Sequence, residues 1–412
     1  MPEQIVITGI GVVSTFGDSP DAFRDAILEG RTGISLDTEF EAQGCRSVLS
    51  ARIAGFEPSK WIPPMKLRRM DDTGPLALVI AQQAAAQAKY AVGTAPNDRA
   101  GVVLGTYNAG GRSTAEYLTA LFNGGPANAP ALLFNSTVGN AAAGLVGLEL
   151  KLRGPNATIS QKEASGLAAI VTAVDLLREG RLDAAIAGGI DSIYDLFYRV
   201  HDRFRVMSDA REPDDSVAPF SARRRGFVMG EGGYGVWLER GDYWRARGAS
   251  RLAEILGVAA SSAAVPLNAW PDRPDPLVRT MRLALDDARI VATDVDVVYA
   301  SANSTQMLDR IETQALSEVF GGSRTMVTSI KGAIGECGAS SAAVLVAAAL
   351  CGSVSTVPPI AGLSSPDPAS ASLNLATSRV RAPARVALVN AFASGGALFS
   401  VVLRVDPASD RL

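Results

Sequence analysis

The sequence predicts an α/β protein built from two similar halves. Several segments join an apolar, β-branched run to a Gly-rich turn and then to a stretch of helical periodicity, which is the pattern of strands and crossover helices in α/β folds. These segments follow the same order in both parts of the chain. In addition, 47% of the 412 residues are hydrophobic and only 20% are charged, which indicates a large buried core.

The first half contains three predicted strands and one long helix. Apolar runs predict strands at 4–13, at 99–106 (RAGVVLGT) and at 183–189 (DAAIAGG). Residues 165–179 have the spacing of an amphipathic helix that ends at Gly180. Strand, turn, helix and strand therefore follow one another as in a βαβ unit.

The second half repeats this order. We expect a helix at 276–288 before a strand at 295–300, and a buried helix of small residues at 339–350. A terminal pair of strands, 385–390 and 398–405, flanks the turn Gly395-Gly396.

No Pro-rich, Ser-rich or charge-rich stretch separates the two halves. A chain of this length without a linker is better described as one body with two fused units than as two separable domains. We place the boundary after residue 245, which gives units 1–245 and 246–412.

Composition excludes several classes of function. The net charge is −3 and no cluster of Lys and Arg stands out, so we expect no nucleic-acid partner. No apolar run approaches the roughly 18 to 20 residues that cross a bilayer, and no signal peptide precedes the first strand, so we expect no membrane association. Cys45, Cys337 and Cys351 form neither a disulfide framework nor a zinc motif. We therefore expect a cytoplasmic protein without a metal or cofactor.

Residues 198–227 differ from the rest of the chain. They carry many charges, two prolines and the run Arg223-Arg224-Arg225. Short charge runs usually face water, so we interpret the segment as a solvated surface loop rather than as a functional basic patch.

The most informative stretch is 154–166, GPNATISQKEASG. A β-branched strand, a tight turn and small residues that open a helix are typical of an elbow that presents one side chain at a helix N-terminus. Here that side chain is Glu163.

Five further motifs extend over nearly the whole chain. They are ITGIGVVS at 7–14, NAAAG at 140–144, PFSARRRGFVMGEGG at 219–233, SIKGAIGECGA at 329–339 and NAFASGG at 390–396. Together with the ISxxxASG frame around Glu163, they resemble the β-ketoacyl synthase family of the thiolase superfamily. The resemblance implies a thiolase-like fold, in which two similar α/β halves form layers in the order α-β-α-β-α.

The resemblance also implies that the catalytic residues of the family are missing. Its nucleophilic cysteine corresponds to Glu163, and its two histidines correspond to Asn303 and Glu336, while the family lysine is kept as Lys331. A carboxylate does not replace a polarizable thiolate as a nucleophile, and an ionised Glu336 would repel the carbanion formed by decarboxylation. Independently of any alignment, the chain has one histidine, His201, and a Cys-His-His set needs two.

Three residues near these motifs have simpler interpretations. We expect His201 to be solvated or locally hydrogen bonded, and Cys337 to be a small buried hydrophobic residue. We interpret Glu163 as a plug of an abandoned pocket, where the macrodipole and the free N–H groups of the helix stabilise a carboxylate by about 0.3 to 1 kcal/mol.

One branch of the family lacks the cysteine and both histidines, namely the chain length factors of type II polyketide synthases. The segment 304–322, STQMLDRIETQALSEVFGG, resembles this branch, although Glu163 stands where aromatic systems usually have glutamine. The resemblance implies a heterodimer with a catalytic ketosynthase, a tunnel for the polyketide chain, and an acyl carrier protein as a further partner. The expected tunnel residues are Thr114, Tyr117, Leu118 and Phe134, of which the first three share one helical face.

Two other functions stay open at this point. The chain can be an enzyme of altered chemistry, such as malonyl-carrier decarboxylation or acyl transfer with Glu163 and Glu336, or a structural homodimeric scaffold. The sequence does not distinguish an aromatic from a reduced polyketide product.

Overall fold

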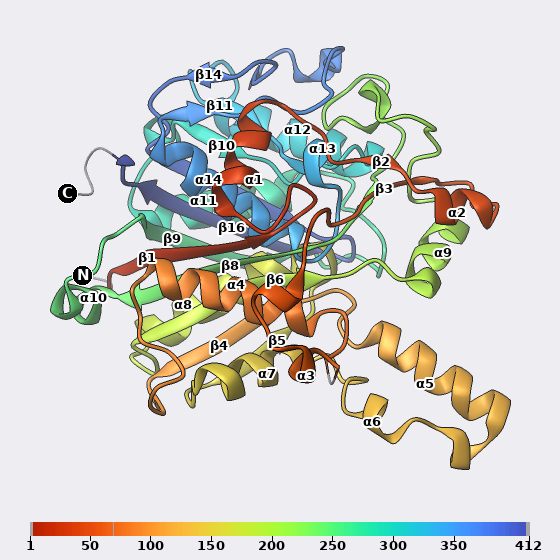
Figure 1. The fold of residues 1–412 in the computed structure, drawn as a ribbon. Helices are drawn as coiled ribbons and strands as arrows, with labels where there is room; N and C mark the ends of the chain where they lie inside the picture. Colours follow the sequence, from red (N-terminus) through yellow and green to blue (C-terminus); the bar gives the residue numbers. More distant parts are fainter. Residues whose placement is uncertain (1–2, 69, 409–412) are drawn as a thin grey trace.

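The computed structural model describes residues 3–68 and 70–408. Within these residues, one large sheet has the strand order β13-β11-β10-β15-β16-β9-β1-β8-β6-β4-β5 (Figure 1). The strands of the first half are β1 (Ile5–Val13), β4 (Ala100–Gly105), β5 (Asn156–Ile159), β6 (Ala184–Asp191) and β8 (Gly232–Arg240). Those of the second half are β9 (Ala253–Ser262), β10 (Val297–Tyr299), β11 (Met326–Thr328), β13 (Asn374–Leu375), β15 (Val386–Phe392) and β16 (Ala397–Val405).

The two halves of the sheet have the same topology. The order β1-β8-β6-β4-β5 of the first half is repeated as β9-β16-β15-β10-β11 in the second. Antiparallel pairing of β1 with β9, which sets Ile5 opposite Ile255, joins the halves into one sheet. The predicted duplication is therefore confirmed, and the strands predicted from apolar runs are all present.

Helices form three layers: one on the outer face of each half of the sheet and one between the two halves. The outer layer of the first half consists of α4 (Gly74–Gln87) and α7 (Ala141–Leu150), and that of the second half of α11 (Asp275–Ala288) and α12 (Gln306–Phe320). Between the two halves lie α8 (Ser165–Arg178) and α14 (Ser340–Ser353), each in contact with strands of both halves. This is the α-β-α-β-α arrangement that the sequence predicted.

The central helices are packed unusually tightly at their N-terminal ends. All residues of α14 are buried, as expected of a helix that is apolar on every side. A Cβ atom at Gly166 would lie only 2.8 Å from the Cβ atom of Ala342. Glycine at this position therefore allows α8 and α14 to begin side by side.

The segment 198–227 is not the solvated loop that its charges suggested. It begins inside α9 (Asp195–Phe204), where Tyr198 is buried and stacks on Phe40. Further on, Asp215 accepts hydrogen bonds from Ser221 Oγ and from the backbone N–H of Ser364. Because its polar groups have partners inside the protein, much of the segment packs against the core.

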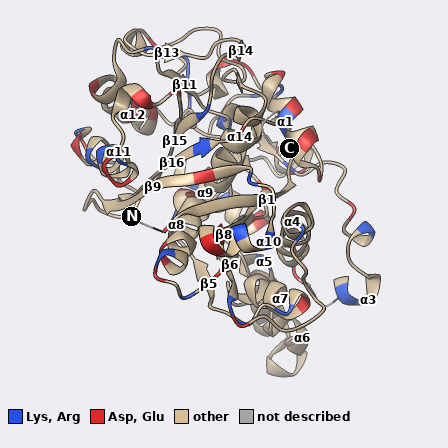
Figure 2. Ribbon diagram, turned by 90° about the vertical axis from the view of Figure 1, so that its left-hand side faces the viewer, with Lys and Arg blue, Asp and Glu red and all other residues tan. Residues whose placement is uncertain are grey.

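The three arginines of the run Arg223-Arg224-Arg225 differ in the exposure of their side chains. Arg223 and Arg225 are mostly exposed, whereas Arg224 turns inward and its Nη1 atom lies 2.6 Å from Asp367 Oδ2. The run is therefore not a continuous basic patch. Figure 2 shows Lys and Arg interspersed with Asp and Glu, while most of the ribbon is uncharged.

An arm projects from the first half (Figure 1). It consists of α5 (Gly111–Gly124), a short 3-10 helix (Pro126–Asn128) and α6 (Ala131–Phe134). Among the residues of α5 only Ser113 is buried, so this helix has no core of its own within the chain.

The remaining helices and strands are short, apart from α1. The helices are α1 (Pro20–Leu28), α2 (Thr38–Ala42), α3 (Pro64–Leu67), α10 (Gly241–Arg247) and α13 (Lys331–Ile334). The strands are β2 (Ser35–Leu36), β3 (Leu49–Ala51), β7 (Met229–Gly230), β12 (Thr356–Val357) and β14 (Val380–Arg381). Among the described residues, we find no helix with the length and hydropathy of a membrane span. In the sequence, α10 connects the last strand of the first half, β8, to the first strand of the second half, β9. The boundary after residue 245 stays a prediction.

Candidate functional site

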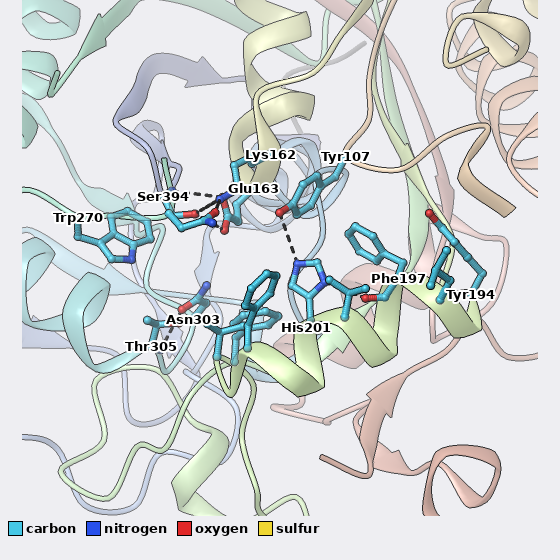
Figure 3. Close-up of a pocket in the computed structure, with 16 residues that line it drawn as sticks. Tyr107, Lys162, Glu163, Tyr194, Phe197, His201, Trp270, Asn303, Thr305 and Ser394 are labelled. Atoms are coloured by element: carbon cyan, nitrogen blue, oxygen red, sulfur yellow. Dashed lines mark hydrogen bonds between the residues drawn. The ribbon is translucent and has the colours of Figure 1, made fainter. Parts of the chain in front are cut away.

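A cavity of about 520 Å³ lies where the turns before α8, after β10 and between β15 and β16 meet α9. Its polar end is formed by Lys162, Glu163, Asn303 and Ser394, and its walls carry the aromatic residues Tyr107, Tyr194, Phe197, Phe204, Phe227 and Trp270 (Figure 3). Apolar walls with a few convergent polar groups are typical of sites that bind small molecules.

Glu163 lies in the elbow before α8, as the sequence predicted. The elbow is a 3-10 turn, Lys162–Ala164, and its first residue has a φ angle of 51°. The Glu163 carboxylate accepts hydrogen bonds from Ser394 Oγ at 3.0 Å and from the Ser394 backbone N–H at 3.3 Å. Burial raises the pKa of this carboxyl, Lys162 opposes the shift, and Glu336 adds to it.

The predicted stabilisation of Glu163 by free N–H groups of the helix is not observed. At the start of α8, the N–H of Gly166 donates to Gly338 O and the N–H of Leu167 donates to Ser341 Oγ. Gly338 lies just before α14 and Ser341 lies in its first turn, because the two central helices begin side by side. Ser394 takes the place of the helix N-terminus as the partner of Glu163.

Glu336 is buried in a closed polar network. Its Oε2 atom accepts from Lys331 Nζ at 2.6 Å and from Asn303 Nδ2 at 2.7 Å, and its Oε1 atom accepts from Ser340 Oγ. Glu336 and Lys331 are each 3% exposed. The retained lysine therefore offsets the charge of Glu336.

The structure brings the three degenerate positions together. Glu163 and Asn303 both line the cavity, and Glu336 lies behind Asn303, to which it is hydrogen bonded. The Asn303 side chain is further fixed because its Oδ1 atom accepts from the N–H of Thr305. The Asn303 amide and the Lys331 ammonium group are thus both hydrogen bonded to another side chain of the protein.

His201 has a larger role in the cavity than the sequence indicated. Its Nδ1 atom is 2.9 Å from Phe197 O, so we assign the proton to Nδ1 and leave Nε2 to accept from Tyr107 Oη at 3.4 Å. Burial lowers the pKa of the imidazole, which favours the neutral ring. The expected local hydrogen bond is present, but the side chain also lines the cavity wall next to Tyr107 (Figure 3).

Most other cavity residues were not predicted from the sequence, and four of them show why. Tyr107 and Trp270 come from loops without a recognisable motif, and only the fold brings them to the site. Lys162 and Ser394 lie inside the quoted motifs, next to Glu163 and to Gly395. The sequence feature that could have identified Lys162 is a charged residue within an elbow of small residues.

The cysteines have no place in the site. Cys337 is buried, and burial raises the pKa of its thiol well above the ordinary value, as expected of an inert cysteine. Cys45 and Cys351 are also buried and free. Among the described residues, no cluster of three or more His, Cys, Asp or Glu side chains is arranged to hold a metal ion.

The four predicted tunnel residues lie on the arm and not in this cavity. Thr114 Oγ1 donates to Gly110 O at 2.8 Å, and the rings of Tyr117 and Phe134 are 5.6 Å apart. Leu118 is 39% exposed and Phe134 is 58% exposed. Within one chain these residues form no tunnel, and their role in an assembly stays a prediction.

The fold and this site define a thiolase-like protein whose elbow before a central helix carries a carboxylate. The family model of the β-ketoacyl synthase N-terminal domain matches residues 2–242, and that of the C-terminal domain matches residues 252–364. The chain belongs to the β-ketoacyl synthase family.

Individual relatives lie in several branches of the family. The tetracenomycin polyketide synthase ketoacyl synthase beta subunit of Streptomyces glaucescens is 33% identical over 376 residues, which cover 89% of this chain and 90% of that protein. Nodulation protein E of Rhizobium sp. (strain N33) is 34% identical over 405 residues, with 96% and 98% covered. The solved ishigamide ketosynthase/chain length factor superposes with a TM-score of 0.90 at 26% identity, over 98% of this chain and 100% of that one.

Proposed function

We propose that this chain is a non-catalytic chain length factor of a type II polyketide synthase. It forms a heterodimer with a catalytic ketosynthase and shapes the tunnel that holds the growing polyketide. The observation that carries the proposal is the closed network around Glu336, in which Lys331 and Asn303 both donate to one carboxylate oxygen.

This network is incompatible with condensation. Condensation needs a thiolate that accepts the acyl chain and two free donors that stabilise the negative charge of the transition state. Glu163 stands at the position of the thiolate, and the amide of Asn303 is already bonded to Glu336. A partner subunit must therefore supply the nucleophile.

The comparisons support assignment to the chain length factor branch, but they do not by themselves distinguish it from the active condensing enzymes. The beta subunit from Streptomyces and the ketosynthase/chain length factor structure favour the proposal. Nodulation protein E is equally similar in sequence, so the family by itself leaves an active condensing enzyme possible. The site residues of this chain are what favour the non-catalytic role.

The arm is the proposed contribution to the tunnel. Within the chain, only Ser113 of α5 is buried. Leu118 on α5 and Phe134 on α6 are exposed apolar side chains. We propose that a catalytic ketosynthase covers this arm, and that Thr114, Tyr117, Leu118 and Phe134 then limit the polyketide. A close-packed wall rejects one further ketide unit at a cost of about 1 to 3 kcal/mol or more.

An acyl carrier protein is the further partner in this proposal, and it delivers extender units to the catalytic subunit. We keep the prediction of a cytoplasmic location, which agrees with the three free cysteines.

The decisive experiment reconstitutes this chain with its catalytic ketosynthase, an acyl carrier protein and malonyl donor, and measures product length by mass spectrometry. Tyr117→Ala and Leu118→Ala are expected to lengthen the product by at least one ketide unit. Thr119→Ala is the matched control, because it lies on the opposite face of α5 and its hydroxyl bonds only to Ala115 O of the same helix.

Two outcomes would favour the alternative functions. An unchanged product distribution over all wall variants would support a homodimeric scaffold. Release of CO2 from malonyl-carrier protein by the chain alone would support an enzyme that decarboxylates, and would overturn the non-catalytic proposal.

A further inference from the structure

Ser394 occupies an unusual position at the polar end of the cavity. It lies in the turn between β15 and β16, directly before Gly395 and Gly396, which both have positive φ angles. Its Oγ atom is 3.0 Å from Glu163 Oε1, and Lys162 Nζ donates a hydrogen bond to the same Oγ atom (Figure 3). The hydroxyl is thus held between a carboxylate and an ammonium group.

Lys162 is positioned by contacts of its own. Its Nζ atom also donates to Asn268 Oδ1 at 2.5 Å and lies 6.0 Å from the centroid of the Tyr107 ring. The positive φ angle of Lys162 belongs to the elbow that directs both Lys162 and Glu163 toward Ser394. A non-glycine residue in this region costs free energy, and such strain persists where the surroundings hold the side chain in place.

The arrangement has the parts of an activated nucleophile. A serine hydroxyl becomes nucleophilic when an adjacent base takes its proton, and Glu163 is within hydrogen-bond distance for this transfer. The higher pKa that burial gives Glu163 makes it a stronger base than an exposed carboxylate. Lys162 supplies the positive charge that stabilises an oxyanion formed next to Ser394.

The cavity defines the class of substrate. Its aromatic walls and its volume of about 520 Å³ suit an apolar acyl chain. Among the described residues at its polar end, no second carboxylic acid faces Ser394 to protonate a poor leaving group. A thiol has an ordinary pKa near 8.5 and leaves as a thiolate without such help.

We propose that Ser394 accepts an acyl group from an acyl thioester, with Glu163 as the base and Lys162 as the oxyanion-stabilising cation. The Ser394 Oγ–H proton moves to Glu163 while Oγ attacks the carbonyl carbon. A C–O bond forms, the C–S bond breaks, and Glu163 returns the proton to the departing thiolate.

The acyl-serine is then hydrolysed by the same groups. Glu163 takes a proton from water, the resulting hydroxide adds to the carbonyl carbon, and the bond to Ser394 Oγ breaks. The proton returns to Ser394, and the products are a carboxylic acid and a free thiol. This activity goes beyond the proposed chain-length function, in which non-catalytic refers to condensation, because it needs neither a partner subunit nor a carbon–carbon bond.

The test uses the full-length chain alone with hexanoyl-N-acetylcysteamine. Thiol release is followed with a thiol-reactive dye, and intact-mass and peptide analysis locate a hexanoyl group on Ser394. Ser394→Ala is expected to reduce thiol release to the background rate, and Glu163→Gln to lower it about 100-fold. Ser378→Ala, at an exposed position, is the matched control and keeps the full rate.

The pH profile separates a chemical from a structural role of Glu163. The rate rises as Glu163 loses its proton, with a midpoint above the ordinary range of a glutamate. The charged and titratable groups that face it are Lys162, Glu336 and Tyr107, and the Glu163→Gln variant loses this pH dependence. Thermal melting confirms that each variant is folded.

Two results would overturn the proposal: no thiol release above buffer by the wild-type chain, or the same rate after Ser394→Ala. Either result leaves the chain-length proposal intact, because that proposal is judged on product length in the reconstituted pair.

Discussion

Replacement of Lys331 by methionine tests the view that Lys331 and Glu336 form a structural ion pair. Lys331 Nζ lies 2.6 Å from Glu336 Oε2, and the side chains are 1% and 2% exposed. Removal of one partner of a buried pair leaves an uncompensated charge, which destabilises a protein by about 3 to 5 kcal/mol. Methionine keeps most of the volume of lysine, so the loss is one of charge rather than of packing.

The expected change in melting temperature follows from the size of the chain. An unfolding entropy of about 2.1 cal/mol/K per residue gives about 0.9 kcal/mol/K for 412 residues. A loss of 3 to 5 kcal/mol therefore lowers Tm by about 3 to 6 °C.

A double-mutant cycle provides the control. Glu336→Gln alone leaves the lysine unpaired and is also destabilising, whereas the double variant with Lys331→Met buries no charge and recovers most of the loss. Urea unfolding of the four proteins measures the coupling. Additive effects of the two substitutions would refute the assignment of these residues as a structural pair.

Three further predictions concern the buried carboxylates, the central helices and the lost chemistry. Burial raises the pKa of Glu312 to about 7, so its contribution to stability is largest below about pH 4.5 and is lost as the pH rises toward 7. Glu312→Gln should remove about 2.5 kcal/mol of the change in unfolding free energy between pH 5 and pH 8, measured by urea unfolding at both values, and an unchanged difference would contradict this. Gly166→Ala should destabilise by about 1 to 3 kcal/mol through its contact with Ala342, measured by thermal unfolding, and a neutral effect would mean that α8 and α14 can separate. Glu163→Cys should not restore condensation by the chain alone, because the donors near Glu336 stay engaged, and a ketone product in mass spectrometry would show otherwise.

Most of the fold could be predicted from the sequence because apolar runs and glycine turns are local signals. The helix at 165–179 and the strand at 183–189 are present as α8 and β6 with shifts of one or two residues. Segment 198–227 was misjudged because some of its polar groups have partners far away in the sequence, such as Arg224 with Asp367 and Asp215 with the N–H of Ser364. Such pairing has no signature in a local window of sequence.

Site residues could be predicted from the sequence only where they lie in a recognised family motif. Glu163, Asn303 and Glu336 were identified by alignment, and the structure places them together. The ion pair between Lys331 and Glu336 was not predicted, because the sequence does not show where a side chain points. Ser394 was missed for the same reason: its partner Glu163 is 231 residues away in the sequence.

The duplicated architecture has a consequence for how this family changes its chemistry. Helices α8 and α14 begin side by side, with Gly166 N–H bonded to Gly338 O, so turns from both halves end at one seam. The polar side chains at the seam, Glu163, Asn303 and Glu336, are not members of the hydrophobic core, which is built from the apolar side chains around them. A lineage can therefore exchange its reactive groups by a few substitutions while the scaffold keeps its foldability, and loss of one activity leaves a shaped, accessible cleft from which another can evolve.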